Sequence, residues 1–341
     1  MQTPNQVTLK PSDHAFTVKA GETILDAALR EGFVISYGCR NGACGTCKGK
    51  VLSGTVDYGN HQASALPESE KRQGFALFCQ ARPLGDVVIE CREVGATRDI
   101  QIRTLPARVQ KMQKLAPDIM LVELKLPASE RLQFLAGQYI DILLKDGSRR
   151  SFSMANAPHD DAVLQLHMRN YGGPFSTHVF SAMKERDILR FEGPLGTFYL
   201  RETSEKPAIL LASGTGFAPV KALLEHAFHT HSARPLILYW GARTRADLYM
   251  HALVERWTRE HNNFKYVPVL SEPRADDAWQ GRTGLVHEAV MKDIADMSGC
   301  QVYACGVPVM VESARRDFTA RCGLPETEFF SDAFTPATPA A

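Results

Sequence analysis

Nine consecutive residues, Cys39-Arg40-Asn41-Gly42-Ala43-Cys44-Gly45-Thr46-Cys47, decide how the first part of this chain folds. Three cysteines are separated by four and then two residues, and a fourth, Cys79, follows much later. Glycines and small residues between the cysteines let the backbone approach closely and turn its N–H groups toward the sulfur atoms. One short loop cannot surround a whole cofactor, so the last thiolate has to come from a distant segment. The pattern therefore predicts a single site built from these four cysteines.

The spacing C-x4-C-x2-C with one later cysteine is typical of the loop that holds a plant-type [2Fe–2S] cluster. Taken alone, Cys44 and Cys47 also fit a dithiol redox pair or half of a zinc site. The additional Cys39 favours the cluster, because zinc ribbons usually present two C-x2-C pairs and thioredoxin-like motifs carry no third cysteine at this offset. The other cysteines, Cys91, Cys300, Cys305 and Cys322, fit no ligand spacing, and we interpret all but Cys305 simply as buried thiols.

Length and charge restrict the class of protein. The 341 residues allow two or three domains, and we expect three. A formal net charge of +1 with 23% charged residues gives no global field that would recruit nucleic acid or an anionic membrane. The N-terminus lacks the features of a signal peptide, and no apolar run approaches the roughly 20 residues of a membrane helix. We expect a soluble, cytoplasmic protein, in keeping with thiolates that must stay reduced.

The cysteine loop lies within a predicted α+β domain of the β-grasp ferredoxin type, residues 1–94. Apolar residues at short spacing predict two strands within residues 7–18, and a helical stretch follows over residues 22–31 until Gly32. Residues 86–94 have the pattern of a closing strand. The next segment, residues 95–102, is polar and without periodicity, which is typical of a linker.

Two further domains are predicted after this linker. Closely spaced strands with Pro and Gly turns indicate a small antiparallel β-barrel over residues 103–205. Its strands are expected at residues 107–110, 119–126, 138–144, 150–154, 162–169 and 188–192. Over residues 206–334 apolar strands alternate with amphipathic helices, which predicts an α/β domain with a parallel sheet. Its strands are expected at residues 208–212, 235–240, 266–270 and 301–304.

The predicted barrel carries two motifs that suit a flavin. In Arg150-Ser151-Phe152-Ser153, the Arg fork can hold a pyrophosphate and the aromatic ring can lie on a flat cofactor. An Arg beside a strand is, however, more often a solvated surface charge. In Gly172-Gly173-Pro-Phe-Ser176-Thr177, Ser176 is a candidate N-cap of a helix over residues 179–183, and the N–H groups that follow could hold a phosphate. A purely structural cap is at least as common.

The third domain opens with a predicted nucleotide turn. The buried strand 209–213 runs into Gly214-Thr215-Gly216-Phe-Ala-Pro219 and then into a helix over residues 220–228. Backbone amides at such a helix start suit a dinucleotide pyrophosphate, and the glycines permit close approach. Pro219 occupies the last position of the usual G-x-G-x-x-G, which favours a related fold over a generic Rossmann dehydrogenase.

Together, these motifs resemble the ferredoxin–NAD(P)H reductase family, in the same order along the chain. Residues 150–153 are similar to its flavin motif R-x-Y-S/T, with Phe152 in place of Tyr. Gly173 and Ser176 match its flavin phosphate loop, residues 214–219 its nicotinamide motif, and Cys305-Gly306-x-x-x-Met310 its nicotinamide-side strand end. The N-terminal ferredoxin domain narrows the resemblance to reductases that serve oxygenases and a few dehydratases. Residues 279–287, 303–306 and 330–334 look most like those of CDP-6-deoxy-Δ3,4-glucoseen reductases.

The resemblance implies a path for electrons from NAD(P)H through FAD and the [2Fe–2S] cluster to an electron-accepting protein, either a dehydratase or an oxygenase component. FAD is expected rather than FMN. Ser153 would hydrogen-bond flavin N5, and Cys305 would line the nicotinamide slot, although a small core thiol is an equal interpretation of Cys305. Phe334 would shield the flavin ring or anchor the C-terminus.

The choice of nicotinamide cofactor depends on Gly241-Ala-Arg243-Thr-Arg245. No acidic residue stands at this strand end to take a ribose 2′-OH, and two arginines could accept a 2′-phosphate. Gly-x-Arg-Thr resembles NADH-using members, so NADH is favoured. A different class of function, a non-catalytic redox sensor, would not need the complete set of nucleotide motifs.

Overall fold

A computed structural model describes residues 5–94 and 100–334 of the chain. The chain divides into two compact units, residues 1–101 and 102–341, which are treated separately below. Within the described ranges, no helix is both long enough and apolar enough to cross a membrane.

The first unit is built on a five-stranded sheet with the strand order β2-β1-β7-β3-β5. β1 and β7 pair in parallel, and the other neighbours are antiparallel. The sheet strands are β1 (Asn5–Lys10), β2 (Ala15–Val18), β3 (Lys48–Ser53), β5 (Phe75–Leu77) and β7 (Val87–Glu90), and β4 (Val56–Asp57) pairs with β6 (Arg82–Pro83). The cysteine loop leads directly into β3.

Helix α1 (Ile24–Arg30) shows why this segment folds locally. The Thr23 side chain caps the helix by accepting the Asp26 N–H, and Ile24, Leu25 and Ala28 are buried. The predicted helix over residues 22–31 is therefore confirmed with shorter ends. The polar segment before Cys79 also contains α2 (Glu68–Arg72) and strand β5, neither of which the sequence pattern predicted.

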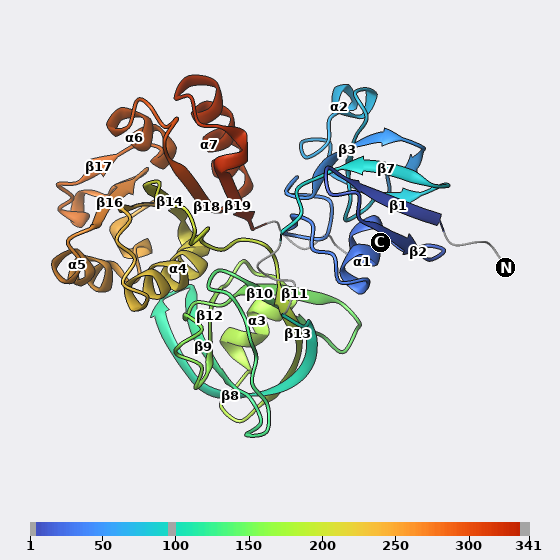
Figure 1. Cartoon of the computed structure of the whole chain (residues 1–341). Coiled ribbons are helices and arrows are strands. Elements are labelled where there is room, and N and C mark those ends of the chain that lie inside the picture. The colour runs from blue at the N-terminus through green and yellow to red at the C-terminus, as the bar shows by residue number, and fades with distance from the viewer. Residues whose placement is uncertain (1–4, 95–99, 335–341) are drawn as a thin grey trace. The chain divides into compact units, whose positions relative to one another are not determined.

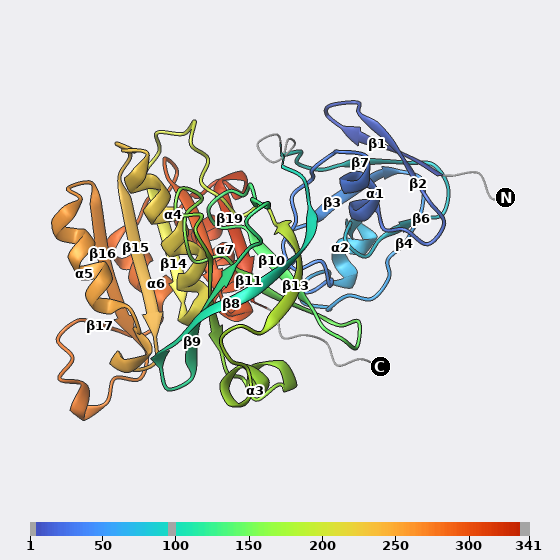
Figure 2. The same ribbon diagram turned by 90° about the horizontal axis from the view of Figure 1, so that it is seen from below.

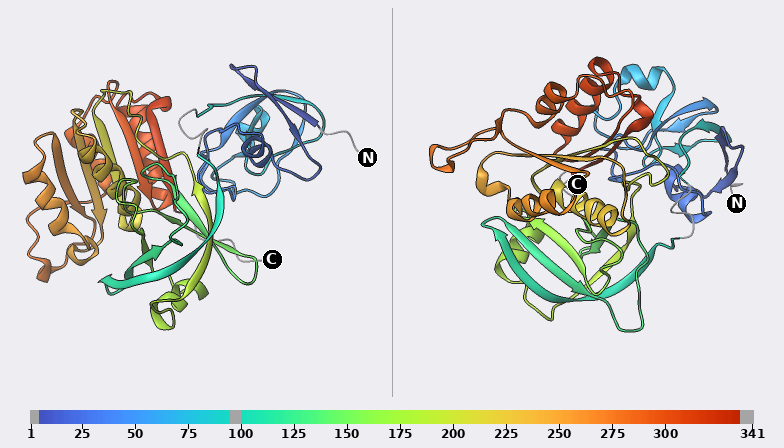
Figure 3. Two further views of the ribbon diagram at one scale, coloured as in Figure 1. Left: turned by 60° about the horizontal axis from the view of Figure 1, so that its bottom comes forward. Right: turned by 60° about the vertical axis from the view of Figure 1, so that its left-hand side comes forward.

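The second unit begins with a six-stranded antiparallel sheet, in the order β11-β10-β13-β8-β9-β12. Its strands are β8 (Arg103–Ala116), β9 (Ile119–Lys125), β10 (Tyr139–Leu143), β11 (Arg149–Ser153), β12 (Leu164–Arg169) and β13 (Ile188–Leu195). The long teal strand β8 curves strongly in Figure 3. An isolated bridge between Met154 and Leu166 joins the chain after β11 to β12. The antiparallel pairing predicted for this segment is present. Barrel closure here, and a β-grasp in the first unit, remain interpretations.

A parallel six-stranded sheet completes this unit, in the order β17-β16-β15-β14-β18-β19. Its strands are β14 (Ala208–Ser213), β15 (Leu236–Ala242), β16 (Phe264–Leu270), β17 (Arg282–Thr283), β18 (Gln301–Gly306) and β19 (Phe329–Ala333). Helices α4 (Phe217–His229) and α5 (His251–Glu260) cover one face, while α6 (Val286–Asp293) and α7 (Pro308–Arg321) cover the other (Figures 1 and 2). Residues 208–212 of β14 are fully buried, as expected for a central parallel strand covered on both faces. The predicted parallel sheet is confirmed.

Candidate functional site

The cysteine loop of the first unit has the backbone that close approach to a cofactor requires. Gly42 and Gly45 have φ of +77° and +73°, in the left-handed region that favours glycine. A Cβ at Gly42 would lie only 2.7 Å from the Asn60 carbonyl oxygen, so the loop packs too tightly for a side chain there. Backbone N–H groups face sulfur atoms: that of Cys39 lies 3.4 Å from Cys44 Sγ, and that of Cys79 lies 3.5 Å from Cys47 Sγ.

The four predicted ligands lie together as two interacting pairs. In each pair one hydrogen bond lowers the pKa of one thiol, Cys44 to about 6 and Cys79 likewise downward, and raises the pKa of its partner, Cys39 or Cys47, so each pair holds a shared proton until iron replaces it. Two pairs of thiolates fit a cluster with two irons, each of which takes two of them. Among the described residues, no three His, Cys, Asp or Glu side chains form a site for one metal ion. The fit of a cluster therefore depends on the paired thiols and the N–H groups aimed at them.

Strand β11 carries the predicted flavin motif, and its residues contact different partners. The Phe152 ring lies 5.9 Å from the Phe175 ring, measured between centroids, so it reaches the helix of the phosphate loop. Ser151 Oγ donates to Asp141 Oδ1 at 2.5 Å, and Arg150 Nη1 donates to the Arg149 carbonyl at 2.8 Å. Alternation along a strand places Arg150 and Phe152 on one face and the two serines on the other. The motif therefore presents its arginine and aromatic ring on one face of β11 and its hydroxyl groups on the other.

The predicted N-cap at Ser176 is wrong. Helix α3 spans Pro174–Ser181, its N-cap is Gly173, and Pro174 occupies the first turn. The fixed φ of proline suits that position, so the helix begins earlier than the apolar pattern indicated. Ser176 lies inside the first turn, where its hydroxyl donates to the Gly173 carbonyl at 3.0 Å, and Thr177 N–H donates to the same carbonyl at 2.9 Å.

The nucleotide turn of the second unit packs directly against β18. Residues Gly214–Gly216 form a single 3-10 turn between β14 and α4. Helix α4 includes Pro219 and is longer than the helix predicted over residues 220–228. A Cβ at Gly216 would lie 2.2 Å from the Cys305 carbonyl oxygen. Gly306 has φ of +143°, and a Cβ there would meet Ser213 Oγ at 2.1 Å. The glycines therefore bring the ends of β14 and β18 into backbone contact.

Ser153 and Cys305 are brought together by a residue that the sequence did not single out. Ser153 Oγ donates to Asp332 Oδ2 at 3.3 Å, and Asp332 pairs with Cys305 in the parallel ladder of β18 and β19. All three are buried. Burial, with the Asp332 charge second, raises the pKa of the Cys305 thiol, so this thiol is neutral and is no free nucleophile. An acidic residue within a buried C-terminal strand was the signal that could have revealed Asp332.

Phe334 and Arg243 each follow a strand of the parallel sheet, β19 and β15 respectively. Phe334 packs against the core of the parallel sheet, and its N–H donates to the Gly306 carbonyl at 2.8 Å, so it anchors the chain after β19. Arg243 follows β15 and is exposed. Arg245 is held by the turn at residues 275–277, since its Nη1 donates to the Asp277 carbonyl at 3.1 Å.

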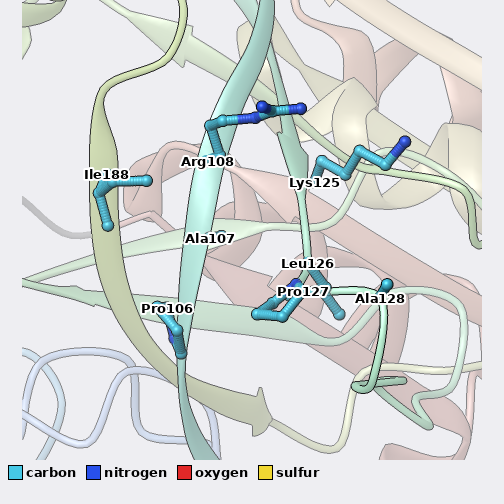
Figure 4. A pocket seen from close by; sticks show the side chains of 8 residues that line it. All are labelled: Pro106, Ala107, Arg108, Lys125, Leu126, Pro127, Ala128 and Ile188. Atoms are coloured by element: carbon cyan, nitrogen blue, oxygen red, sulfur yellow. The ribbon is translucent and has the colours of Figure 1, made fainter.

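A groove on the antiparallel sheet lies apart from all these residues. It has a volume of about 400 Å³ and is lined by β8, the end of β9, the following 126–128 segment and Ile188 of β13 (Figure 4). None of its lining residues belongs to the flavin or nicotinamide motifs. The chemistry of the motifs, and not the size of a cavity, therefore identifies the site.

Comparison with known proteins agrees with this geometry. Three domain families match in order: the 2Fe-2S iron-sulfur cluster binding domain over residues 7–84, the oxidoreductase FAD-binding domain over residues 106–199, and the oxidoreductase NAD-binding domain over residues 210–316.

Relatives match nearly the whole chain. CDP-6-deoxy-L-threo-D-glycero-4-hexulose-3-dehydrase reductase of Yersinia pestis is 40% identical over 97% of this chain and 98% of its own length. Terephthalate 1,2-dioxygenase reductase component 1 of Comamonas is 33% identical over 97% of both chains. The crystal structure of the Amycolatopsis cytochrome P450 reductase GcoB has a TM-score of 0.79 and 34% identity, covering 98% of this chain and 100% of that one.

The fold and these matches define an iron–sulfur flavoprotein oxidoreductase. The chain belongs to the ferredoxin–NAD(P)H reductase family, in the group with an N-terminal [2Fe–2S] ferredoxin domain. It is an NAD(P)H-dependent enzyme whose cofactors are a [2Fe–2S] cluster, FAD and NAD, as predicted. Bound FAD accepts a two-electron hydride and releases single electrons, which a [2Fe–2S] cluster can carry to a partner enzyme.

Proposed function

We propose that this chain supplies electrons to a sugar-nucleotide dehydrase, as a reductase of the CDP-6-deoxy-hexulose-3-dehydrase type. The observation that carries the proposal is the 40% identity over nearly the full length of both chains with the Yersinia reductase whose name describes that activity. Residues 279–287, 303–306 and 330–334 also resemble that group of reductases.

The proposed roles of the site residues follow from their contacts. Cys39 and Cys44, which share a hydrogen bond, would hold one iron, and Cys47 and Cys79 would hold the other. Arg150 would fork to the FAD pyrophosphate, N–H groups of the first turn of α3 would add to it, and Phe152 would lie against the flavin. The Gly214–Gly216 turn takes the dinucleotide.

Ser153 would hydrogen-bond flavin N5. Its single hydroxyl hydrogen donates to Asp332 Oδ2 at 3.3 Å, so the Ser153 oxygen would be the acceptor of a hydrogen carried by N5. Cys305 would fill the slot beside the nicotinamide as a neutral thiol, while Gly306 leaves room for the hydroxyl of Ser213. We propose domain limits of 1–94, 103–205 and 206–334, and these limits enclose the three matched families.

NADH is the proposed reductant. Arg245 is engaged by the backbone of Asp277, which leaves Arg243 as the single cation proposed to face the adenosine ribose. One exposed arginine is a weaker site for a 2′-phosphate than two converging ones. The ratio of kcat/KM for NADH to that for NADPH should therefore exceed one, and a ratio below one would contradict this assignment.

The electron acceptor can be tested directly. The NADH-reduced protein is mixed without oxygen with the purified Yersinia dehydrase and its CDP-sugar substrate, and cluster reoxidation is followed by absorbance. A parallel experiment uses the oxygenase component of terephthalate dioxygenase. Faster reoxidation by the dehydrase supports the proposal.

The second candidate, an oxygenase reductase component, is favoured by the relatives from Comamonas and Amycolatopsis. Faster reoxidation by the oxygenase component would establish this alternative and exclude the dehydrase partner. A non-catalytic redox sensor would transfer electrons to neither protein at a useful rate, although its cluster would still be reducible by dithionite.

A further inference from the structure

Arg169 lies where the antiparallel sheet of the second unit meets the parallel sheet. It is the last residue of β12, and the chain continues from it into the 170–173 segment that begins α3. Its side chain is 12% exposed. Nε donates to Asp118 Oδ2 at 2.7 Å, within the antiparallel part, and Nη2 donates to Asp247 Oδ1 at 3.1 Å, within the parallel part. One partly buried cation therefore joins a carboxylate from each part.

Asp247 connects Arg169 to the turn that follows β15. Its other oxygen, Oδ2, accepts from the Thr244 backbone N–H at 3.0 Å and from the Thr244 hydroxyl at 2.9 Å. The two oxygens of one carboxylate thus have separate tasks: Oδ1 binds Arg169, and Oδ2 caps the 244–247 turn. Burial alone would raise the pKa of Asp247, but the hydrogen bonds from Thr244 and the charges of Arg169 and Arg243 lower it overall, so the carboxylate is ionised at neutral pH.

The same guanidinium lies against the first glycine of the nucleotide turn. A Cβ at Gly214 would be 3.1 Å from Arg169 Nη1, and φ of this glycine is +53°. The Gly214 carbonyl accepts from Trp240 Nε1 at 3.2 Å, which fixes the turn on its other side. Since β14 and β15 are neighbouring parallel strands, Arg169 touches the turns at both of their carboxyl ends, where open α/β sheets bind nucleotides.

A second contact from β12 reinforces this arrangement. His167 precedes Arg169 by two residues and therefore lies on the same face of the strand. Its Nδ1 is 2.9 Å from the Tyr249 hydroxyl, and Tyr249 follows Asp247 by two residues. Further from the turns, Lys221 Nζ donates to the Ala155 carbonyl at 2.9 Å. These contacts keep the two parts associated when Arg169 is removed, so its own contribution can be measured.

We propose that Arg169 is a positioning residue for hydride transfer, which fixes the two nucleotide turns of the parallel sheet relative to the flavin motif. The proposal goes beyond the reductase assignment, because it says how the geometry of the two sites is kept, and it does not depend on which protein accepts the electrons. Hydride transfer is sensitive to donor–acceptor placement, and a displacement of about 1 Å can cost on the order of 100-fold in rate.

The test measures flavin reduction in the holoenzyme by stopped flow, with NADH and with NADH deuterated at C4. In Arg169→Ala the limiting rate constant should fall by roughly 10- to 100-fold. The deuterium isotope effect should persist, while the NADH concentration for half-maximal rate changes less than the rate. FAD content and cluster reduction by dithionite should match the wild type. Hydrogen exchange of the amides at residues 214–216 and 244–247 should become faster, and this readout does not depend on turnover.

Two further variants separate positioning from general stability. Asp247→Asn keeps an oxygen for Thr244 but loses the charge that pairs with Arg169, so it should reproduce the defect even if Arg169→Ala does not fold. Asp118→Asn breaks only the contact within the antiparallel part and should lose much less rate. An unchanged limiting rate in Asp247→Asn, an equal defect in Asp118→Asn, or a slower rate without faster hydrogen exchange would each overturn the proposal.

Discussion

Adding one methyl group at Gly216 should disable the nicotinamide side of the enzyme. A Cβ at this position would lie 2.2 Å from the Cys305 carbonyl oxygen and 2.8 Å from Gly306 Cα. These are backbone atoms and have no rotamer by which to move away. A carbon–oxygen contact needs roughly 3.3 Å, so Gly216→Ala must move the turn and the end of β18 apart by about 1 Å. The cost should be about 1–3 kcal/mol of stability and on the order of 100-fold in hydride-transfer rate.

The assay compares Gly216→Ala with Gly299→Ala. Gly299 lies in the same predicted domain, and a Cβ there would meet no atom within 4 Å. Urea unfolding gives the stability of each variant, and stopped-flow mixing with NADH gives the rate of flavin reduction. Gly299→Ala should behave as the wild type in both. If Gly216→Ala reduces its flavin at the wild-type rate, the close contact between the nucleotide turn and β18 does not position the nicotinamide, and the reasoning fails.

The remaining predictions concern the cluster, the flavin and a buried histidine. Cys44→Ser should lose the cluster but keep FAD, since serine is a poor iron ligand. Iron analysis should show the loss, and the variant should still reduce ferricyanide but not cytochrome c with NADH; an unaltered iron content would refute the ligand assignment. Arg150→Ala should lose FAD on gel filtration while its cluster absorbance remains, and retention of FAD would remove Arg150 from the pyrophosphate site. Burial, and secondarily the Lys221 charge, lowers the pKa of His167 to about 3. The unfolded state then binds more protons than the folded state between about pH 6.5 and 3. The free energy of unfolding should therefore decrease as the pH falls through this window, by up to about 1.4 kcal/mol per pH unit. His167→Gln should show a shallower fall in acid urea titrations, and an identical slope would contradict the assignment.

Local sequence patterns were sufficient to predict the structure of segments that fold largely through contacts within themselves. The cysteine loop, the helix within residues 22–31 and the buried β14 strand each follow from residues close together in sequence, and the structure contains all three. The N-cap at Ser176 was misjudged because the apolar pattern begins after Pro174, whereas the helix starts at the proline itself. Neighbouring choices within one turn have similar free energies, so a helix start is predicted less reliably than its existence.

Sequence alone determined the chemistry: the cysteine spacing, the glycine turns and the order of the motifs restrict which cofactors the chain can hold, because ligand type and backbone freedom are properties of individual residues. Only the tertiary structure decided which distant side chains meet. Asp332 lies beside Cys305 and Ser153 because β19 pairs with β18 and packs near the end of β11. Arg169 reaches Asp247 because two sheets, separate in sequence, pack at that point. Such contacts depend on the registers of many strands at once, which no local pattern encodes.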